Sequence, residues 1–377
     1  MSDTLAQALM DEFASSTGVS GKMPPRRYLW TDAFGVCNFL GLYRQTGNQH
    51  DLKLAVDLVD QTHHILGRHR QDDPRRGWIS GLSDEEGERH PTRGGLRIGK
   101  RLNERGPLER PDSRLEWDQD GQYFHYLTKW IHALYRLSRE TGEHRYLHWA
   151  VELAATAHSA FTYEVAPGGP KRMVWKMSID LRRPLVTSMG QHDALDGLIT
   201  FLELEAAAGL NAAERAALAT PIADTIAMCQ DTRWATDDPL GIGGLLDSAT
   251  RLAQLVFGHA LERRALLRKI LVEANVSLQA FGRSSLLERP AEYRLPFREL
   301  GLAIGLYGLQ RINMLAKGEL ELGPIIGGLL LYTPLADRIR TFWSDPAHRH
   351  GSTWMDHRDI NTVMLATSLV PDGYLQI

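Results

Sequence analysis

Apolar residues recur every three or four positions along most of this chain, which is the spacing of amphipathic helices. The pattern is clear in residues 52–65, where polar residues separate Leu52, Ala55, Val56, Leu58, Val59 and Ile65. It returns over 120–161, 191–231, 242–281 and 296–343, and in a last stretch over 356–369. The chain is therefore predicted to be built almost wholly from helices.

A short sequence motif occurs twice, and from its Thr-Gly pair onward the two copies are 95 residues apart. Leu-Tyr-Arg at 42–44 precedes Thr46-Gly47 and His63. Leu-Tyr-Arg at 134–136 precedes Thr141-Gly142 and His158. Each copy is typical of a helix, a glycine-containing turn and a second helix. One hairpin cannot bury its apolar face alone, so the repetition predicts an array or closed ring of hairpins.

Six hairpins account for the whole pattern. Helix starts and turns are marked by Asn211, Gly258, Pro296 and Lys317-Gly318. The last helix is expected to pair with an amphipathic stretch over 5–13 near the N-terminus. We therefore expect one all-α domain over 1–377, folded as an (α/α)6 barrel.

Two long segments interrupt the helical pattern, at 71–117 and 163–188. The first is rich in Gly, Pro, Arg and Glu, and we expect it to form a partly β-structured cover over one mouth of the barrel. In the second, residues 173–180 have the composition of a strand. Long inserts of this kind in a compact domain usually carry function.

Composition excludes several classes of protein. The 377 residues are 43% hydrophobic and 24% charged with a formal net charge of −3, which gives no electrostatic reason to expect nucleic acid or an anionic membrane as partner. Residues 1–17 lack a signal-peptide pattern, and the longest apolar run, 325–332, is too short to cross a bilayer. Only Cys37 and Cys229 are present, so we expect no disulfide framework and a cytoplasmic protein.

The predicted starts of the inner helices combine aromatic and acidic residues. An aromatic residue precedes an aspartate by one or two positions in Trp30/Asp32, Trp117/Asp118 and Trp354/Asp356. Inner helices of such a barrel run parallel, so their starts gather at one end. Indole faces stack on sugar rings and carboxylates accept hydrogen bonds from hydroxyls, although Asp at a helix start also serves as a cap.

The expected architecture and the Trp-Thr-Asp-Ala-Phe sequence at 30–34 resemble the six-hairpin glycosidase superfamily. Its members include unsaturated glucuronyl and rhamnogalacturonyl hydrolases and acylglucosamine 2-epimerases. In the unsaturated uronyl hydrolases, an Asp near an inner-helix start is the general acid/base, and Asp32 and Asp120 occupy comparable starts here. The adjacent-Asp signature of that family is absent from those positions; Asp237-Asp238 lies before the fourth hairpin.

The resemblance implies a carbohydrate substrate and carboxylate chemistry. A glycosidase needs two carboxyl groups. Asp32 and Asp120 are the preferred pair, Asp118 and Asp193 are reserves, and His192 beside Asp193 is a candidate proton shuttle. The candidate substrate-binding residues are Trp30, Trp117, Tyr123, His125, Trp175, Lys176, Glu299, Trp354, Asp356 and His357.

No cofactor is expected. The Gly-x-x-x-x-Gly-Lys match at 94–100 is followed by Arg101 instead of Ser or Thr, and it lacks the strand and helix of a phosphate loop. His63-His64 and His348-Arg349-His350 invite a metal interpretation, but His63 falls on an outer helix. We therefore expect no metal.

Three functions remain open from the sequence. The first is a glycoside hydrolase acting on an oligosaccharide or uronide. The second is a sugar epimerase or isomerase in which His125 and His192 act as bases. The third is a non-catalytic carbohydrate-binding scaffold.

Overall fold

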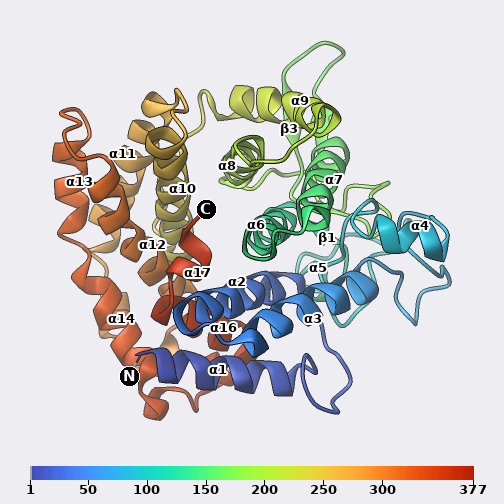
Figure 1. Ribbon diagram of the computed structural model, residues 1–377, viewed down its shortest axis with the longest axis horizontal. Helices are drawn as coiled ribbons and strands as arrows, with labels where there is room; N and C mark the ends of the chain where they lie inside the picture. The colour runs from blue at the N-terminus through green and yellow to red at the C-terminus, as the bar shows by residue number, and fades with distance from the viewer. Residues whose placement is uncertain (1) are drawn as a thin grey trace. The chain divides into compact units, whose positions relative to one another are not determined.

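The computed structural model describes residues 2–377 and consists mainly of helices (Figure 1). It divides into two compact units. Unit 1 comprises Met1–Ala14, Gly41–Asn48 and Arg233–Ile377, and unit 2 comprises Ser15–Leu40 and Gln49–Thr232. The single domain expected from the sequence stays a prediction.

Unit 2 contains the repeated hairpins. Its long helices are the first part of α2 (Leu29–Thr46), α3 (Gln49–Leu66), α6 (Phe124–Thr141), α7 (His144–Phe161), α8 (Asp193–Glu205) and α9 (Ala212–Cys229). Helix α6 packs against α3, α7 and α8, and α7 packs against α9. The hairpins predicted over 120–161 and 191–231 are thus confirmed.

Local signals explain how these hairpins turn. Gly142 ends α6 with a φ of 71°, a left-handed conformation that glycine adopts without steric cost. Asn211 caps α9 as predicted. Its side chain accepts a hydrogen bond from the backbone N–H of Glu214, whose carboxylate accepts one from the N–H of Asn211, which completes a capping box.

The repeated histidine lies in the core of unit 2. His63 on α3 is buried, and its Nε2 accepts a hydrogen bond of 3.0 Å from Nε1 of Trp130 on α6. Burial lowers the pKa of His63 to about 3, so the ring is neutral. Its counterpart His158 lies 2.8 Å from Asp224 of α9. The histidines of the repeated motif therefore join neighbouring helices and have a structural role.

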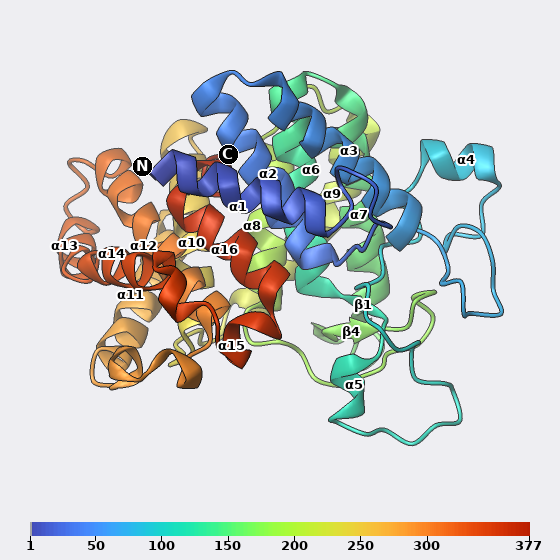
Figure 2. The same cartoon turned by 90° about the horizontal axis from the view of Figure 1, so that it is seen from below.

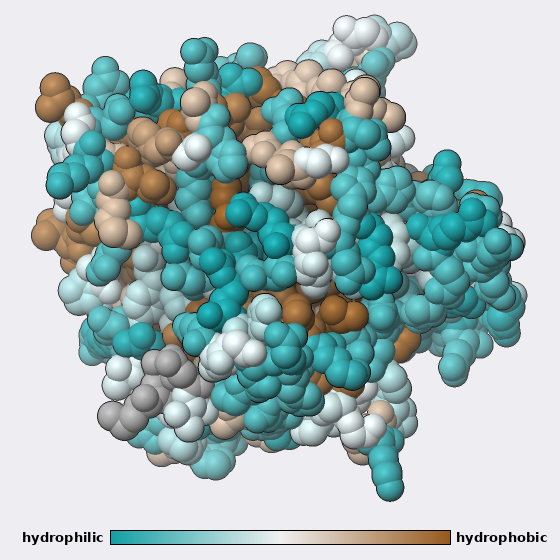
Figure 3. All heavy atoms as spheres, in the orientation of Figure 1, coloured by the Kyte–Doolittle hydropathy of each residue, from teal (hydrophilic) through white to brown (hydrophobic). Residues whose placement is uncertain are grey.

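The two inserts carry little regular structure. The first contains α4 (Asp84–Arg89) and α5 (Leu115–Asp118), and among its described residues β pairing is limited to isolated bridges at Trp78 and Leu102. Strand β1 (Gln122–Tyr123) pairs antiparallel with β4 (Lys176–Met177), as Figure 2 shows beside α5. Strand β2 (Thr162–Glu164) pairs with β3 (Lys171–Met173). Around α4 the surface is strongly hydrophilic (Figure 3).

The single strand expected over 173–180 is also wrong, because it is divided between β3 and β4. Val174 N–H donates to the carbonyl of Phe161, and Trp175 N–H donates to that of Ser188. The carbonyl of Trp175 accepts from Phe124 N–H at the start of α6. The backbone between the two strands therefore changes partners and ties the insert to α6 and α7.

All regular secondary structure among the described residues of unit 1 is helical. It contains most of α1 (Ser2–Ser16), the end of α2, α10 (Pro239–Gly258), α11 (Arg264–Phe281), α12 (Pro296–Leu315), α13 (Gly323–Leu330), α14 (Pro334–Ser344), α15 (Ser352–Met355), α16 (Arg358–Leu369) and α17 (Asp372–Leu375). It also has three short 3-10 helices, η1 (Leu286–Glu288), η2 (Ala291–Tyr293) and η3 (Pro346–His348). Helix α10 packs against α11 and α12, and α12 packs against α14 and α16.

The predicted hairpin over 242–281 is confirmed, while the one over 296–343 differs in its second half. Its second helix is broken into α13 and α14, because Pro334 begins a new helix. The last predicted helix begins at Arg358, after the separate turn of α15. The guanidinium of Arg358 binds Glu12 of α1 at 2.5 Å, so α1 lies beside α16 as predicted.

Helices α10 and α12 approach each other closely through glycine. A Cβ added at Gly243 would lie 2.1 Å from the carbonyl oxygen of Gly301, and one added at Gly305 would lie 2.5 Å from that of Gly243. The absence of side chains lets the two backbones touch. Among the described residues, no helix combines the length and apolar character that crossing a membrane requires.

Candidate functional site

A continuous group of aromatic side chains occupies one part of unit 2. It comes from the start of α2, the segment around α5, the start of α6 and the approach to β4. We call it the aromatic cluster, and its members are Tyr28, Trp30, Trp117, Tyr123, Tyr126 and Trp175.

Tyr126 is the centre of this cluster. Its ring centroid lies 5.6 Å from Tyr28, 6.2 Å from Trp30 and 5.0 Å from Tyr123, and its hydroxyl lies 2.7 Å from that of Tyr28. Burial raises the pKa of Tyr28 to about 12, so its phenol stays protonated at neutral pH. Sequence reasoning did not select Tyr126, although its three-residue spacing from Tyr123 places both near the start of α6.

The cluster extends from the interior to the surface. Tyr123 lies 5.2 Å from Trp175, which stacks on Trp117 at 5.4 Å with an interplanar angle of 29°. Trp30 is 7% exposed, whereas Trp117 is 59% exposed. The aromatic faces therefore lead from the start of α2 out to solvent.

Beside the cluster lies a carboxyl group with an unusual environment. Asp193 is the first residue of α8 and is buried. Its Oδ2 accepts a hydrogen bond of 3.1 Å from Gly190 N–H, and its Oδ1 lies 4.0 Å from Nδ1 of His125 on α6. The His125 ring in turn stacks on Tyr123 at 5.6 Å and meets Tyr126 edge-on at 4.7 Å.

Burial shifts the pKa values of both groups toward their neutral forms. It raises the pKa of Asp193 to about 7, and the negative charge of Asp196 raises it further, against the opposing effects of the Gly190 hydrogen bond and Lys129. It lowers the pKa of His125 to about 4, an effect that Lys129 reinforces and Asp196 opposes. At neutral pH, part of the Asp193 population is therefore protonated and His125 is an uncharged imidazole.

Gly190 is required by this geometry. A Cβ at this position would lie 2.4 Å from Oδ2 of Asp193, closer than any side chain allows. The glycine lets the backbone N–H reach the carboxyl directly. One turn further along α8, Asp196 lies 3.5 Å from Nζ of Lys129, which supplies a positive charge at the base of the site.

Asp32 and Asp120, the catalytic pair expected from the sequence, have surroundings that differ from those of Asp193. Asp32 is buried and accepts hydrogen bonds from the N–H of Tyr28 at 3.0 Å and from Oγ1 of Thr62 at 3.4 Å, with Arg27 at 3.7 Å. A carboxylate that accepts the N–H four residues before it stabilises the helix start. This geometry favours capping of α2 as its role.

Asp120 is fully buried and holds the first insert in place. Its Oδ2 binds Nη1 of Arg97 at 3.0 Å and of Arg70 at 3.3 Å, and its Oδ1 accepts from the N–H groups of Gly99 and Gly121. These four bonds occupy both oxygens. By contrast Asp118, at the end of α5, is exposed.

Lys176 also has a structural role, because it contacts the segment around α5 and the ring of Tyr123. It is buried, forms an ion pair of 2.8 Å with Glu116, donates to the carbonyls of Glu116 and Gln119, and lies over the ring of Tyr123 at 5.4 Å. Burial lowers its pKa. His192, the residue before α8, is half-buried.

The remaining candidates lie in unit 1. Glu299 is buried, paired with Arg294 at 2.5 Å, and accepts from Nε1 of Trp343 at 2.8 Å. Trp354 is buried, whereas Asp356 and His357 are exposed before α16. Within unit 2 the structure brings Trp30, Trp117, Tyr123, His125, Trp175 and Asp193 together.

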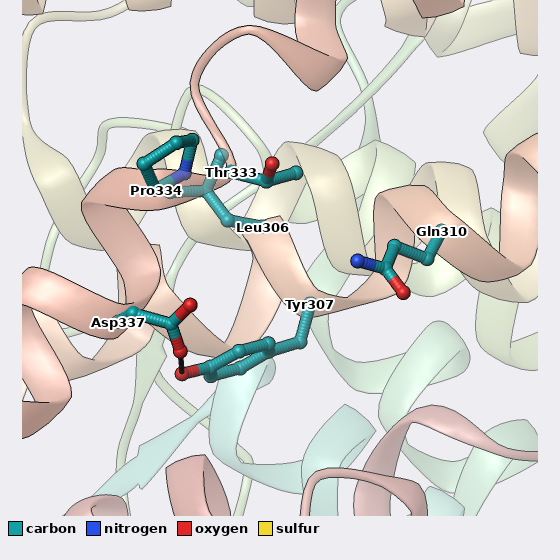
Figure 4. Close-up of a pocket in the computed structure, with 6 residues that line it drawn as sticks. All are labelled: Leu306, Tyr307, Gln310, Thr333, Pro334 and Asp337. Carbon is teal, nitrogen blue, oxygen red and sulfur yellow. Dashed lines mark hydrogen bonds between the residues drawn. The ribbon is translucent and has the colours of Figure 1, made fainter.

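A pocket in unit 1 involves none of the predicted residues. Its lining, shown in Figure 4, consists of Leu306, Tyr307, Gln310, Thr333, Pro334 and Asp337. The hydroxyl of Tyr307 donates to Oδ1 of Asp337 at 2.9 Å, which closes one side of the pocket.

Comparison with known proteins shows what the fold is. No family model matches the chain, and no curated protein matches it by sequence. Among solved structures, the GH76A alpha-1,6-mannanase from Salegentibacter sp. HEL1_6 is similar with a TM-score of 0.55 and 12% identity over 98% of each chain. An inactive variant of that enzyme in complex with alpha-1,6-mannotriose matches with a TM-score of 0.54 and 12% identity over 98% of this chain and 99% of that one. Cellobiose 2-epimerase from Spirochaeta thermophila DSM 6192 matches with a TM-score of 0.53 and 13% identity over 97% of each chain. The chain therefore shares the (α/α)6 fold of these enzymes, as its repeated hairpins predict.

Proposed function

We propose that this chain is a carbohydrate-active enzyme, a glycoside hydrolase in which Asp193 is the general acid. The observation that carries the proposal is the buried carboxyl of Asp193, whose pKa is raised to about 7 beside an aromatic cluster. A glycosidase acid must be protonated at working pH and must then give its proton to the departing oxygen. A pKa near 7 suits both requirements.

The aromatic cluster provides a surface for a sugar. The C–H faces of a pyranose ring pack on indole and phenol rings, while its hydroxyls donate to carboxylates. The stacked pair Trp117 and Trp175 gives such a surface at the exposed end of the cluster. The structural likeness to a mannanase and to a cellobiose epimerase supports a carbohydrate as the ligand.

His125 does not oppose the protonation of Asp193. An imidazole with a pKa of about 4 carries no charge at neutral pH, so it does not favour the ionised carboxylate as a histidinium would. Its place 4.0 Å from Asp193 fits a polar neighbour that orients the acid.

A hydrolase also needs a second carboxylate that stays ionised. We assign this role to Asp118, because it is exposed and its negative charge contributes to raising the pKa of Tyr123 in the aromatic cluster. Asp32 and Asp120, whose oxygens hold α2 and the first insert, then have structural roles.

Asp193→Asn and Asp118→Asn test the assignment on a panel of glycosides that includes α-1,6-linked mannooligosaccharides. Loss of an acid or base costs about 10²–10⁴-fold in kcat. Asp112→Asn is the matched control, because Asp112 is an exposed acid of the same insert whose role as an acceptor at α5 the amide retains. Full activity of Asp193→Asn would refute the proposal.

An aryl glycoside sharpens the experiment. A dinitrophenolate leaves without being protonated, so Asp193→Asn is expected to cleave such a substrate nearly as fast as the wild type. Asp118→Asn gains nothing from that substrate if Asp118 is the base or nucleophile. Equal losses on both substrates for Asp193→Asn would show that the residue is not the acid. Saturable sugar binding without turnover by the wild type would favour a scaffold.

One feature favours a second function, a sugar epimerase. A neutral imidazole facing a protonated carboxyl is suited to removing a proton beside a carbonyl group while the acid protonates the carbonyl oxygen. Deuterium incorporation from D₂O into the sugar, without new reducing ends, would identify this reaction. His125→Asn would then abolish exchange, whereas in the hydrolase it lowers activity only through Asp193.

A further inference from the structure

A second group of chemically active side chains lies in unit 2, on α7 and the end of α4. His144, His148 and Glu152 occupy successive turns of α7, and the first two form a helical His-x-x-x-His pair. The sequence expectation of no metal overlooked this pair. His90 comes from a separate segment, at the C-terminal end of α4.

Three of these residues converge. Nδ1 of His90 lies 2.8 Å from Oε2 of Glu152, and the rings of His90 and His148 are 5.7 Å apart. One ligand atom from each of His90, His148 and Glu152 lies within 4.8 Å of the others. We propose that these three residues bind a divalent transition-metal ion of the Zn²⁺ type.

The surroundings orient the proposed ligands. Oγ1 of Thr92 donates to Oε1 of Glu152 at 2.8 Å, which leaves Oε2 directed at His90. Oε1 of Glu214 lies 3.2 Å from Nδ1 of His148. A carboxylate on one imidazole nitrogen fixes the tautomer and leaves the other nitrogen with its lone pair for a metal.

Glu214 is itself held in position. Its Oε2 accepts the N–H of Asn211 at 2.9 Å in the capping box of α9. The group thus has an inner set of two imidazoles and one carboxylate and an outer set of hydrogen-bond partners. Such an outer set distinguishes a metal site from a chance surface pair, because it fixes each ligand before the ion arrives.

The donor set selects the class of ion. Two imidazoles and one carboxylate suit Zn²⁺ and its neighbours, whereas Mg²⁺ and Ca²⁺ prefer oxygen ligands. Donors around tetrahedral zinc lie roughly 3.4 Å apart, as bonds of about 2.0–2.1 Å require. Small side-chain movements therefore bring the three atoms into range, and water completes the coordination because the ligands are only half-buried.

The proposed ion would fasten the first insert to α7. Nε1 of Trp149 already donates to the carbonyl of Arg89 at 2.9 Å, and Oγ1 of Thr92 lies 3.0 Å from the carbonyl oxygen of Trp149. A metal bridging His90 to His148 adds a cross-link between segments far apart in the sequence. Binding to the folded chain alone stabilises it by mass action.

The test begins with protein dialysed against a chelator and titrated with Co²⁺, a visible probe for zinc sites, and then with Zn²⁺. We expect one Co²⁺ per chain, d–d absorption bands that Zn²⁺ abolishes, and a rise in Tm of a few degrees at a hundredfold excess over Kd. Mg²⁺ is expected to have no effect. Absence of a one-to-one Co²⁺ complex in the wild type would overturn the proposal.

Variants locate the site. Glu152→Gln keeps an oxygen that accepts the hydrogen bond from Thr92 but loses the anionic ligand. Glu152→Gln and His148→Gln, made as separate variants, are each expected to weaken Co²⁺ binding by at least about tenfold. Glu214→Gln keeps the capping box and is expected to weaken binding by about 10–100-fold through His148. Unchanged Co²⁺ affinity in all three variants would refute the assignment.

His64→Gln is the matched control. His64 and Glu88 form an exposed histidine–carboxylate pair at 2.8 Å in the same unit, with the cation of Arg68 beside it in place of a second imidazole. Its loss is expected to leave the Co²⁺ spectrum and affinity unchanged. An equal loss of affinity in His64→Gln would show that the ion binds elsewhere. Sugar turnover is not used as a readout, so the result is independent of the proposed function.

Discussion

Replacing Asp193 with Asn removes one buried ionisable group and little else. The side chain keeps its size, and its carbonyl oxygen still accepts the hydrogen bond that Gly190 N–H donates to Oδ2 at 3.1 Å. Asp193 is only 6% exposed, so the charge that is lost was nearly desolvated. The variant therefore measures how much an ionised carboxylate at this buried position lowers the free energy of unfolding.

The pKa shift gives the magnitude and the sign. Burial raises the pKa of Asp193 from 3.8 to about 7, which at about 1.4 kcal/mol per pH unit corresponds to about 4 kcal/mol. Between these two values the folded chain keeps a proton that the unfolded chain releases, so wild-type stability falls as pH rises through this window. Above about pH 7 the whole penalty is present, and below about pH 4 it vanishes.

Asn does not titrate, so the stability of Asp193→Asn relative to the wild type should rise by about 4 kcal/mol between about pH 4 and pH 7 and then stay level. Urea unfolding of both proteins across this range measures the difference. The change with pH is the decisive quantity, because a new amide donor adds only a constant. Asp112→Asn, at an exposed position, serves as control.

A difference that does not change with pH would refute the reasoning, because it would mean that the pKa of Asp193 is ordinary in the folded chain. The assignment of Asp193 as general acid would fall with it. Activity provides a second readout. If the proton on Asp193 is required, log kcat/KM of the wild type should fall with a slope of −1 above about pH 7.

Four further substitutions test other parts of the structure. Gly190→Ala places a methyl group 2.4 Å from the nearby carboxyl, so kcat/KM should fall at least about tenfold while circular dichroism stays unchanged. Asp120→Asn removes the carboxylate that pairs with the buried guanidinium of Arg97, whereas Arg70 keeps Asp72 at 2.7 Å, and it should cost about 3–5 kcal/mol in urea unfolding; lost activity at full stability would instead support the catalytic role expected from the sequence. Trp117→Ala should raise KM several-fold without lowering Tm, because this side chain is 59% exposed, and an unchanged KM would exclude it from sugar binding. Gly243→Ala should cost about 1–3 kcal/mol by forcing α10 from α12, whereas Gly244→Ala, where a Cβ meets nothing within 4 Å, should not destabilise; equal effects would contradict the close helix contact.

The sequence by itself determined the helical hairpins, because their signals are local. Apolar spacing defined α6 with α7 and α8 with α9, and Asn211 and Gly142 marked a start and an end. Each signal lies within a few residues of the feature that it produces. The expected strand over 173–180 failed for the opposite reason, because its backbone partners lie elsewhere in the chain.

The tertiary structure alone decided what each aspartate does. Asp32, Asp120 and Asp193 all lie near predicted helix starts, so their local sequence does not separate them. Packing brings Arg97 and Arg70 to Asp120, places Asp32 as a cap of α2, and buries Asp193 beside His125. A pKa depends on how much protein surrounds a group and which charges lie within a few ångströms, and both are set by segments distant in sequence. The same holds for His90, which meets His148 and Glu152 only because the first insert folds back onto α7.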